Sequence, residues 1–140
     1  MQISNLVPLI KMNVGKLEKD MNRDLMQYGI TCSQARVILV LYESADGILS
    51  MKELEKTFQV TQQTMLGIVK RLENKNLVER CSDSQDSRIK RIRLTSDGAS
   101  LGENVYKSFC HTQVKINQAL TEKEQDTLRV LLNKLYVSIV

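Results

Sequence analysis

The sequence predicts a mainly α-helical fold with one small β-hairpin, and three observations carry this prediction. One proline and six glycines are too few for the frequent turns of an all-β protein. Apolar residues recur at helical spacing over most of the chain, and the period changes only between about residues 77 and 94. Hydrophobic residues make up 42% and charged residues 26% of the 140 residues, which argues against disorder and against a membrane protein.

The helix termini are marked by local signals. A long first helix is predicted over residues 3–28, with Gly29 as its natural stop. Capping boxes at Thr31–Gln34, Ser50–Glu53 and Thr121–Glu124 each pair a hydroxyl residue with a Glu or Gln three positions later. Thr61 is a plausible N-cap for a further helix. We therefore expect helices to begin at these four positions.

The expected helices have definite extents. The second runs to about residue 44, with Val37, Ile38, Leu41 and Tyr42 facing inward. The third ends near residue 58, and the fourth spans residues 61–75, where Asn76 supplies a left-handed end. Two helices are expected after the hairpin, over residues 96–120 and 122–139.

The hairpin is expected between the fourth and fifth helices. Leu77–Cys81 and Arg88–Leu94 are predicted to be strands, and the polar run Ser82–Ser87 is predicted to be the tip. Two short helices with a tight turn, followed by a hairpin, are typical of a winged helix-turn-helix. We therefore expect a single domain over residues 1–140, with a winged helix-turn-helix lobe over residues 31–95.

The remaining helices carry more apolar surface than a small lobe can cover. The helices after the hairpin contribute Leu101, Val105, Phe109, Val114, Leu128, Leu131, Leu132, Leu135 and Ile139. We therefore expect residues 1–28 and 96–140 to be dimerisation helices of a homodimer. The alternative is that these helices pack on their own lobe.

The net charge of +4 is concentrated in the segment that contains the predicted fourth helix and the hairpin. Residues 61–95 contain eight basic and four acidic residues, and the rest of the chain is balanced. A local basic excess indicates a polyanionic partner such as double-stranded DNA. A basic face that is merely solvated is the alternative.

Helical geometry separates the fourth helix into two faces. Met65, Ile68, Val69 and Leu72 fall on an apolar face that docks the helix onto the lobe. Amides, hydroxyls and cations in its first turns and on the other face suit a major groove and its phosphates. The candidate DNA-binding residues on this helix are Thr61, Gln62, Gln63, Thr64, Gly67, Lys70 and Arg71. An ordinary surface helix is the alternative.

The returning strand of the hairpin adds further cations. Arg88, Lys90 and Arg91 are candidate DNA contacts, and with Arg93 they place four cations within six residues. We expect these cations to repel one another unless a polyanion offsets them. Arg88 is expected to enter a minor groove, and Asp86 is close enough to orient it. A local turn-stabilising ion pair between these two residues is the alternative and is compatible with DNA binding.

Signals for catalysis, metals and cofactors are weak. His111 is the one histidine, and the sequence has no H-E-x-x-H motif, no C-x-x-C motif and no glycine-rich phosphate loop. We therefore expect no enzyme, no cofactor and no metal. Cys32 lies in the first turn of a helix, where the dipole lowers a thiol pKa, so a thiol switch at Cys32 or Cys110 remains an alternative.

The expected location is the cytoplasm. Three widely spaced cysteines fit a reducing compartment better than a disulfide framework. The longest strongly apolar stretch, Val37–Tyr42, is far shorter than a membrane span, so no membrane partner is expected. The N-terminus shows no pattern of a secretion signal.

The sequence resembles the MarR (multiple-antibiotic-resistance regulator) family of winged helix-turn-helix transcriptional regulators over nearly the whole chain. Asp86-Ser87-Arg88, together with Ile92–Thr95 and Gly98, is similar to the Asp-x-Arg wing of the family and to its Leu-Thr that opens the next helix. The segment Leu72–Arg80 resembles the connection from the recognition helix to the wing. Ile30–Gln34 resembles the start of the second helix of the family.

This resemblance implies a sequence-specific DNA-binding repressor that recognises a palindromic operator as a homodimer. It implies that the helix from Thr61 reads the major groove, that Arg88 enters the minor groove and that a small-molecule effector weakens DNA binding. Asn76 stands where the family usually has Gly, and Asn tolerates the same backbone. The peroxide-sensing cysteine of the family lies in the first helix, which has none here. A winged-helix protein-interaction module without DNA binding remains the alternative.

Overall fold

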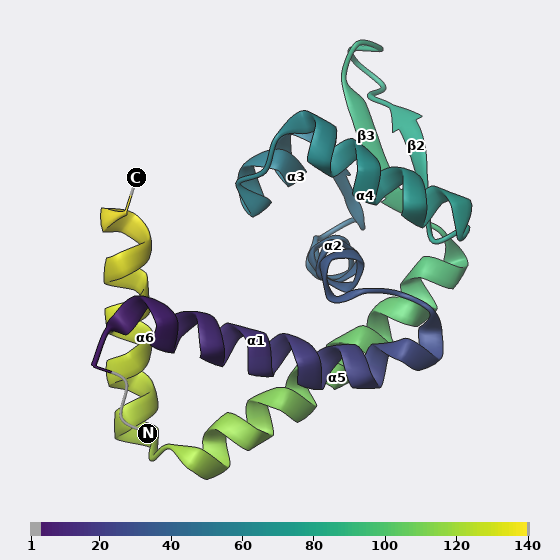
Figure 1. Ribbon diagram of the computed structural model, residues 1–140. Coiled ribbons are helices and arrows are strands. Elements are labelled where there is room, and N and C mark those ends of the chain that lie inside the picture. The colour runs from purple at the N-terminus through teal and green to yellow at the C-terminus, as the bar shows by residue number, and fades with distance from the viewer. Residues whose placement is uncertain (1–3, 140) are drawn as a thin grey trace. The chain divides into compact units, whose positions relative to one another are not determined.

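The computed structural model describes residues 4–139, which are mainly helical and include one small antiparallel sheet (Figure 1). The predicted fold class is therefore confirmed. Two compact units are present: one comprises the chain up to Ser108, and the other begins at Phe109. Within residues 4–139 no helix combines the length and the apolarity that a membrane crossing requires.

The first helix, α1, spans Leu6–Leu25 and continues into a short 3-10 turn, η1, over Met26–Tyr28. Gly29 follows with φ 67°, a left-handed conformation that favours glycine, so the predicted stop is confirmed. The Asn5 side chain caps the start of α1 by accepting a hydrogen bond from the backbone. The predicted start at Ile3 lies outside the described residues.

Helix α2 spans Cys32–Glu43, and the predicted capping box that opens it is present. Val37, Ile38 and Leu41 are fully buried. Tyr42 was expected to face inward as well, but it is 39% exposed because its ring lies at the edge of this core. The ring nevertheless packs closely on Gly102, where a Cβ atom would lie 2.7 Å from a ring carbon.

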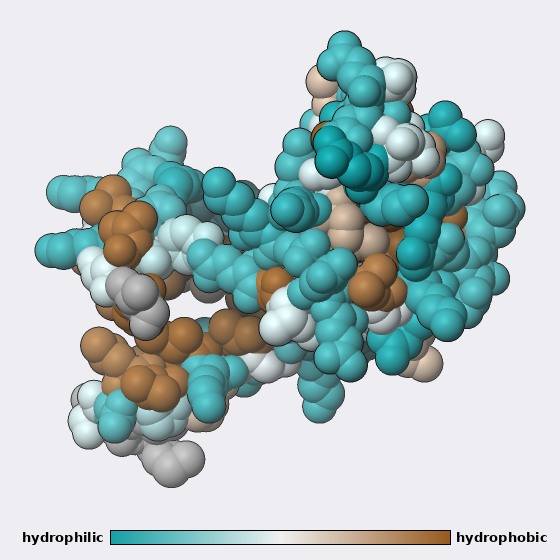
Figure 2. Space-filling model, turned by 90° about the horizontal axis from the view of Figure 1, so that it is seen from above, coloured by the Kyte–Doolittle hydropathy of each residue, from teal (hydrophilic) through white to brown (hydrophobic). Residues whose placement is uncertain are grey.

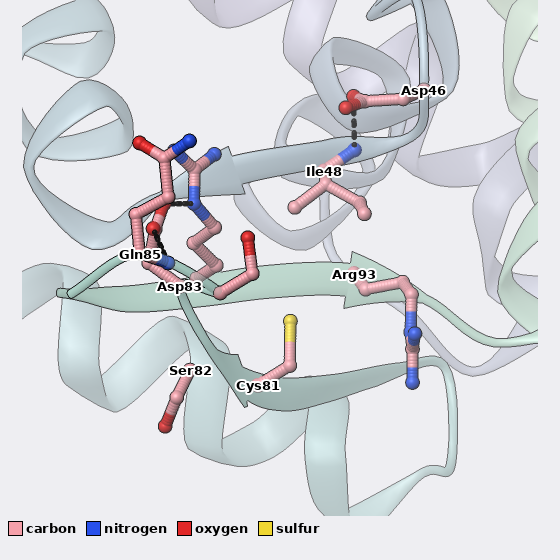
Figure 3. A pocket seen from close by; sticks show the side chains of 9 residues that line it. Asp46, Ile48, Cys81, Ser82, Asp83, Gln85 and Arg93 are labelled. Atoms are coloured by element: carbon pink, nitrogen blue, oxygen red, sulfur yellow. Dashed lines mark hydrogen bonds and ion pairs between the residues drawn. The ribbon is translucent and has the colours of Figure 1, made fainter. Parts of the chain in front are cut away.

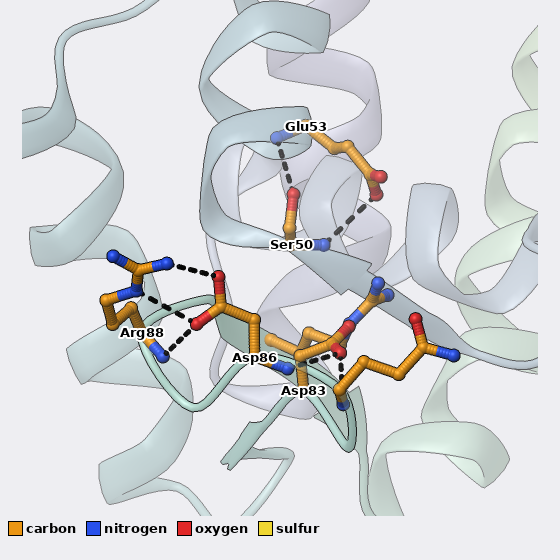
Figure 4. Close-up of polar contacts among 7 residues, drawn as sticks. Ser50, Glu53, Asp83, Asp86 and Arg88 are labelled. Carbon is orange, nitrogen blue, oxygen red and sulfur yellow. Dashed lines mark hydrogen bonds and ion pairs between the residues drawn. The ribbon is translucent and has the colours of Figure 1, made fainter.

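Helices α3 and α4 form the helix-turn-helix. The Ser50–Glu53 capping box opens α3 (Met51–Phe58), as the close-up in Figure 4 shows. Gln59, with φ 52°, turns the chain toward α4 (Gln62–Asn74). These two helices pack against each other, and α4 also contacts α2.

The sheet has three antiparallel strands in the order β1-β3-β2. They are β1 (Ile48–Ser50), β2 (Val78–Ser82) and β3 (Lys90–Leu94). The two-stranded prediction was incomplete because β1 also pairs with β3. The predicted start of the third strand at Arg88 was also early, since Arg88 belongs to the tip.

The polypeptide after the sheet forms α5 (Ser96–Ala119) and α6 (Glu122–Ser138), and the predicted capping box at Thr121 opens α6. Leu101 and Val105 are buried within the first unit, so these two apolar residues need no partner subunit to cover them. In the second unit, by contrast, the described residues of α6 include no buried residue. Figure 2 shows patches of apolar side chains on the molecular surface.

The junction between α4, the sheet and α5 is built around Leu77 and Thr95. Asn76 adopts φ 60°, as its predicted role at the helix end requires. The Thr95 backbone N–H donates to the Leu77 carbonyl oxygen at 3.1 Å, and the Thr95 hydroxyl donates to the Asn76 carbonyl oxygen at 2.7 Å. The same hydroxyl accepts the Gly98 N–H at 3.0 Å. These bonds fix the base of the hairpin relative to α4.

Candidate nucleic-acid interface

Helix α4 presents one buried and one exposed face. Met65, Val69 and Leu72 are fully buried, which confirms three of the four predicted core positions, while Ile68 is half-buried. The hydroxyl of Thr61 accepts the Thr64 N–H at 3.2 Å, so the predicted N-cap is confirmed. The helix therefore packs on the rest of the lobe through its apolar face.

The opposite side of α4 is open to solvent. Gln62 and Gln63 are exposed in the first turn, and the hydroxyl of Thr64 lies 2.9 Å from that of Thr61. Lys70 and Arg71 are exposed, and neither forms an ion pair with the described carboxylates. These donors and cations have the chemistry that base edges and phosphates require.

Gly67 leaves a gap in the side-chain layer of this face. A Cβ atom there would meet only the end of the Arg71 side chain, at 3.7 Å. Neither sterics nor a left-handed backbone therefore demands glycine at this position. The gap would allow another molecule to approach the helix backbone closely.

The hairpin β2–β3 forms the wing beside α4 (Figure 1). At its tip the Arg88 side chain is 90% exposed. Asp86 accepts hydrogen bonds from Arg88 Nε at 3.1 Å, from Arg88 Nη2 at 3.2 Å and from the Arg88 backbone N–H at 3.0 Å (Figure 4). These bonds lower the pKa of the Asp86 carboxyl. The expected orientation of Arg88 by Asp86 is thus present.

The expectation that the wing cations need a polyanion was wrong. Arg88 pairs with Asp86, Arg91 with Asp83 at 2.6 Å, and Arg93 with Glu79 at 2.6 Å. Carboxylates of the wing itself therefore offset most of the repulsion among the strand cations. Of the four cations, Lys90 alone lacks a carboxylate partner in the described part of the chain.

The candidate contact Arg91 lies in a different environment from Arg88. Its side chain is 33% exposed and lines a pocket formed by the wing and the segment 46–48, together with Asp83 and Gln85 (Figure 3). Its guanidinium is held by the Asp83 carboxylate, which raises the pKa of Arg91. This position gives Arg91 a structural task within the wing.

Asp83 is a residue that sequence reasoning did not single out. It lies in the polar run at the tip, where its carboxylate binds two backbone N–H groups and Arg91. An Asp followed by Ser and Gln in a turn-prone run is a signal for such an Asx-turn. The Asx-turn sequence does not specify which cation Asp83 binds, because that depends on the register of the strands.

The thiol pKa expected for Cys32 was wrong. Cys32 is buried, and burial raises the pKa of its thiol, with Glu18 raising it further and Arg36 lowering it. The helix dipole is therefore outweighed by the loss of hydration. Cys110, in contrast, is exposed. Among residues 4–139, no group of three or more His, Cys, Asp or Glu side chains could hold a metal ion.

A sequence model described as the MarR family matches residues 28–89, the segment from the α1–α2 turn to the wing tip. The chain is 32% identical to the HTH-type transcriptional regulator FarR of Neisseria gonorrhoeae over 111 residues, which are 79% of this chain and 75% of FarR. It is 28% identical to the HTH-type transcriptional regulator PrsX of Escherichia coli, covering 86% of this chain and 72% of PrsX. These relatives are named as transcriptional regulators and not as enzymes.

Solved structures agree with this assignment. The S. aureus MepR–DNA complex matches with a TM-score of 0.91 and 27% identity, covering 98% of this chain and 100% of MepR. A mutant of E. coli MarR complexed with operator DNA matches with a TM-score of 0.84 and 28% identity, covering 93% and 92% of the two chains. The chain therefore belongs to the MarR family of winged helix-turn-helix transcriptional regulators.

Proposed function

We propose that this protein is a cytoplasmic, non-enzymatic transcriptional regulator that binds a palindromic site in double-stranded DNA as a homodimer. The single observation that supports this most strongly is the exposed polar and cationic face of α4 beside a wing tip that presents Arg88. The MepR and MarR structures to which the chain is similar are DNA complexes. Repression, and its relief by a small-molecule effector, are part of the proposal because the family resemblance implies them.

In this proposal α4 enters the major groove. Gln62 and Gln63 offer amides suited to the N6 and N7 atoms of adenine, and Lys70 and Arg71 reach phosphates or guanine. The Thr61 and Thr64 hydroxyls and the helix N-terminus favour a phosphate oxygen. Gly67 admits the DNA close to the helix backbone.

The wing meets the adjacent minor groove, whose negative potential attracts a guanidinium group. Arg88 is the residue proposed to insert there, and Lys90 is placed to contact the phosphate backbone. Arg91 contributes to this surface mainly through the wing that it holds together.

Apolar surface on two helices supports the homodimer. The described residues of α1 leave several large apolar side chains exposed, namely Leu6, Val7, Leu9, Ile10, Met12, Val14 and Leu17. Those of α6 do the same with Leu128, Val130, Leu131, Leu132, Leu135, Tyr136 and Val137. Apolar surface on this scale is typical of a subunit interface. A two-fold dimer would place two α4 helices about 34 Å apart, which matches successive major grooves.

The test is selection of duplexes from a randomised pool, followed by binding measurements with variants. We expect the selected sequences to share an inverted repeat with half-site centres about 10 base pairs apart. Arg88→Ala should weaken binding to all selected duplexes, with a shallower dependence on salt. Gln63→Ala should change base preference at particular positions.

A matched control is Arg23→Ala, which removes the same charge from an exposed position near the end of α1. It should bind the selected duplexes nearly as the unaltered protein does. If Arg88→Ala and Gln63→Ala bound like the unaltered protein, the assigned reading surface would be wrong. If the unaltered protein bound no duplex at low salt, a protein-interaction module would replace the proposal.

A further inference from the structure

Asp83 connects the wing tip to the strand that follows it. Its Oδ1 atom accepts the backbone N–H groups of Gln85 at 2.8 Å and Asp86 at 3.2 Å. Its Oδ2 atom accepts Arg91 Nε at 2.6 Å, and its own N–H donates to the Ile89 carbonyl oxygen at 3.2 Å. The side chain is 13% exposed, so this carboxylate is well shielded from solvent (Figures 3 and 4).

The second carboxylate of the tip depends on the first. Asp83 binds the backbone N–H of Asp86, and the Asp86 carboxylate in turn binds Arg88 in the bidentate arrangement described above. In the described part of the chain, Asp86 is the acceptor for the hydrogen bonds of the Arg88 side chain. The direction of Arg88 therefore depends on the position of Asp86, which is held by Asp83 and by the Ile89 N–H that donates to the Asp86 carbonyl oxygen at 3.1 Å.

Arg91 anchors this arrangement to the sheet. It lies on β3, opposite Cys81 of β2 in the ladder and opposite Ser50 of β1. Because β3 is the central strand, the Arg91 backbone lies between two neighbouring strands. The bond of its side chain to Asp83 therefore ties the tip loop to the middle of the sheet.

We propose that Asp83 is a positioning residue for DNA recognition, which it serves without touching DNA by holding Asp86 and thereby aiming Arg88. The inference rests on the proposed function, because it needs Arg88 to contact DNA. In this arrangement the Asp83 carboxylate is bound to the sheet through Arg91, and the Asp86 carboxylate holds the Arg88 guanidinium. The inference also assigns Arg91 to this support.

Electrostatics alone predicts the opposite effect of removing Asp83. A carboxylate near the DNA backbone repels phosphates, so its loss should tighten binding. Loss of a positioning group should weaken binding. The Arg88 side chain would then be mobile in the free protein, and ordering it on DNA would cost conformational entropy. The sign of the change in affinity therefore separates the two effects.

The experiment measures the affinity of each variant for a duplex selected with the unaltered protein. Asp83→Ala should weaken binding by about three- to tenfold, the scale expected for loss of a preorganising charge-assisted contact. Asp46→Ala is the matched control, since Asp46 is an exposed carboxylate that lines the same pocket and accepts the Ile48 backbone N–H rather than a group of the tip loop. It should bind as tightly as the unaltered protein or slightly more tightly.

A double-mutant cycle tests the route through Arg88. In the Arg88→Ala background, Asp83→Ala should cause no further weakening, because there is no guanidinium left to position. Asp83→Asn retains an oxygen for the two N–H groups but loses the ion pair, so it should fall between Asp83→Ala and the unaltered protein. Thermal unfolding of each variant verifies that it is folded.

Three outcomes would overturn the inference while the proposed function stands. These are unchanged or tighter binding by Asp83→Ala, equal weakening in both backgrounds, and equal weakening by the Asp46→Ala control. Amide hydrogen exchange at Gln85 and Asp86 provides a readout without DNA, and Asp83→Ala should accelerate it. If the unaltered protein bound no duplex but this exchange still accelerated, the proposed function would fail while the support of the tip by Asp83 would hold.

Discussion

Substitution of Gly98 by alanine should destabilise the fold strongly. A Cβ atom at Gly98 would overlap the Leu77 carbonyl oxygen and would lie 3.0 Å from its carbonyl carbon and 3.1 Å from Leu94 Cδ2. The Leu77 carbonyl is backbone and cannot rotate aside. It also accepts the Thr95 N–H, so displacing it weakens a bond at the base of the hairpin.

The magnitude follows from these contacts. Overpacking of a well-packed site costs about 1–3 kcal/mol, and a weakened hydrogen bond adds about 1 kcal/mol. The better helix propensity of alanine returns about 1 kcal/mol. The last two terms cancel, so we expect Gly98→Ala to lower the free energy of unfolding by about 1–3 kcal/mol, or the Tm by roughly 2–12 °C for a domain of this size.

Circular dichroism during thermal and urea unfolding, without DNA, measures this change. The matched control is Gly67→Ala, since Gly67 also lies in a helix but its Cβ would meet only Arg71, at 3.7 Å. The control should raise the free energy of unfolding by about 1 kcal/mol through helix propensity. An unchanged or higher Tm for Gly98→Ala would refute the close approach of α5 to Leu77.

Two further predictions concern titratable groups. Cys32 should react with a disulfide reagent more slowly than the half-buried Cys81 and the exposed Cys110, because Cys32 is buried and its thiol pKa is raised. Equal reaction rates for Cys32 and Cys81 in the folded protein would contradict this prediction. Hydrogen bonds from Gln85 and then Arg91 lower the pKa of the Asp83 carboxyl from its ordinary 3.8. The stability that Asp83 adds should therefore be present above its unfolded pKa and disappear as pH falls through its lower folded pKa. The Tm difference between the unaltered protein and Asp83→Asn should therefore shrink as the pH falls through the folded pKa of Asp83. A Tm difference that grows in acid would contradict this prediction.

The helix starts could be predicted because their signals are local. The capping boxes at Thr31, Ser50 and Thr121 each lie within four residues and need no knowledge of the fold. The left-handed residues Gly29 and Asn76 are equally local. The family resemblance rested on similarly short motifs around the wing.

What could not be predicted depends on distant partners. Strand β1 is three residues long and exists because it pairs with Arg91–Arg93, some forty positions away in the sequence. The pairing of Arg93 with Glu79 requires a register that places them opposite each other. The Cys32 thiol was misjudged because its helix position is local whereas its burial is tertiary. The residues assigned to DNA contact remain predictions.

The exposed apolar stripe of helix α6 makes the stability of the protein depend on its concentration if two subunits associate through it. Its described residues include no buried one, although its sequence carries a dense apolar stripe. If a second copy covers this stripe, association contributes to the free energy of unfolding by mass action. Dilution should then lower the melting temperature, so the stability of the regulator would follow its own abundance.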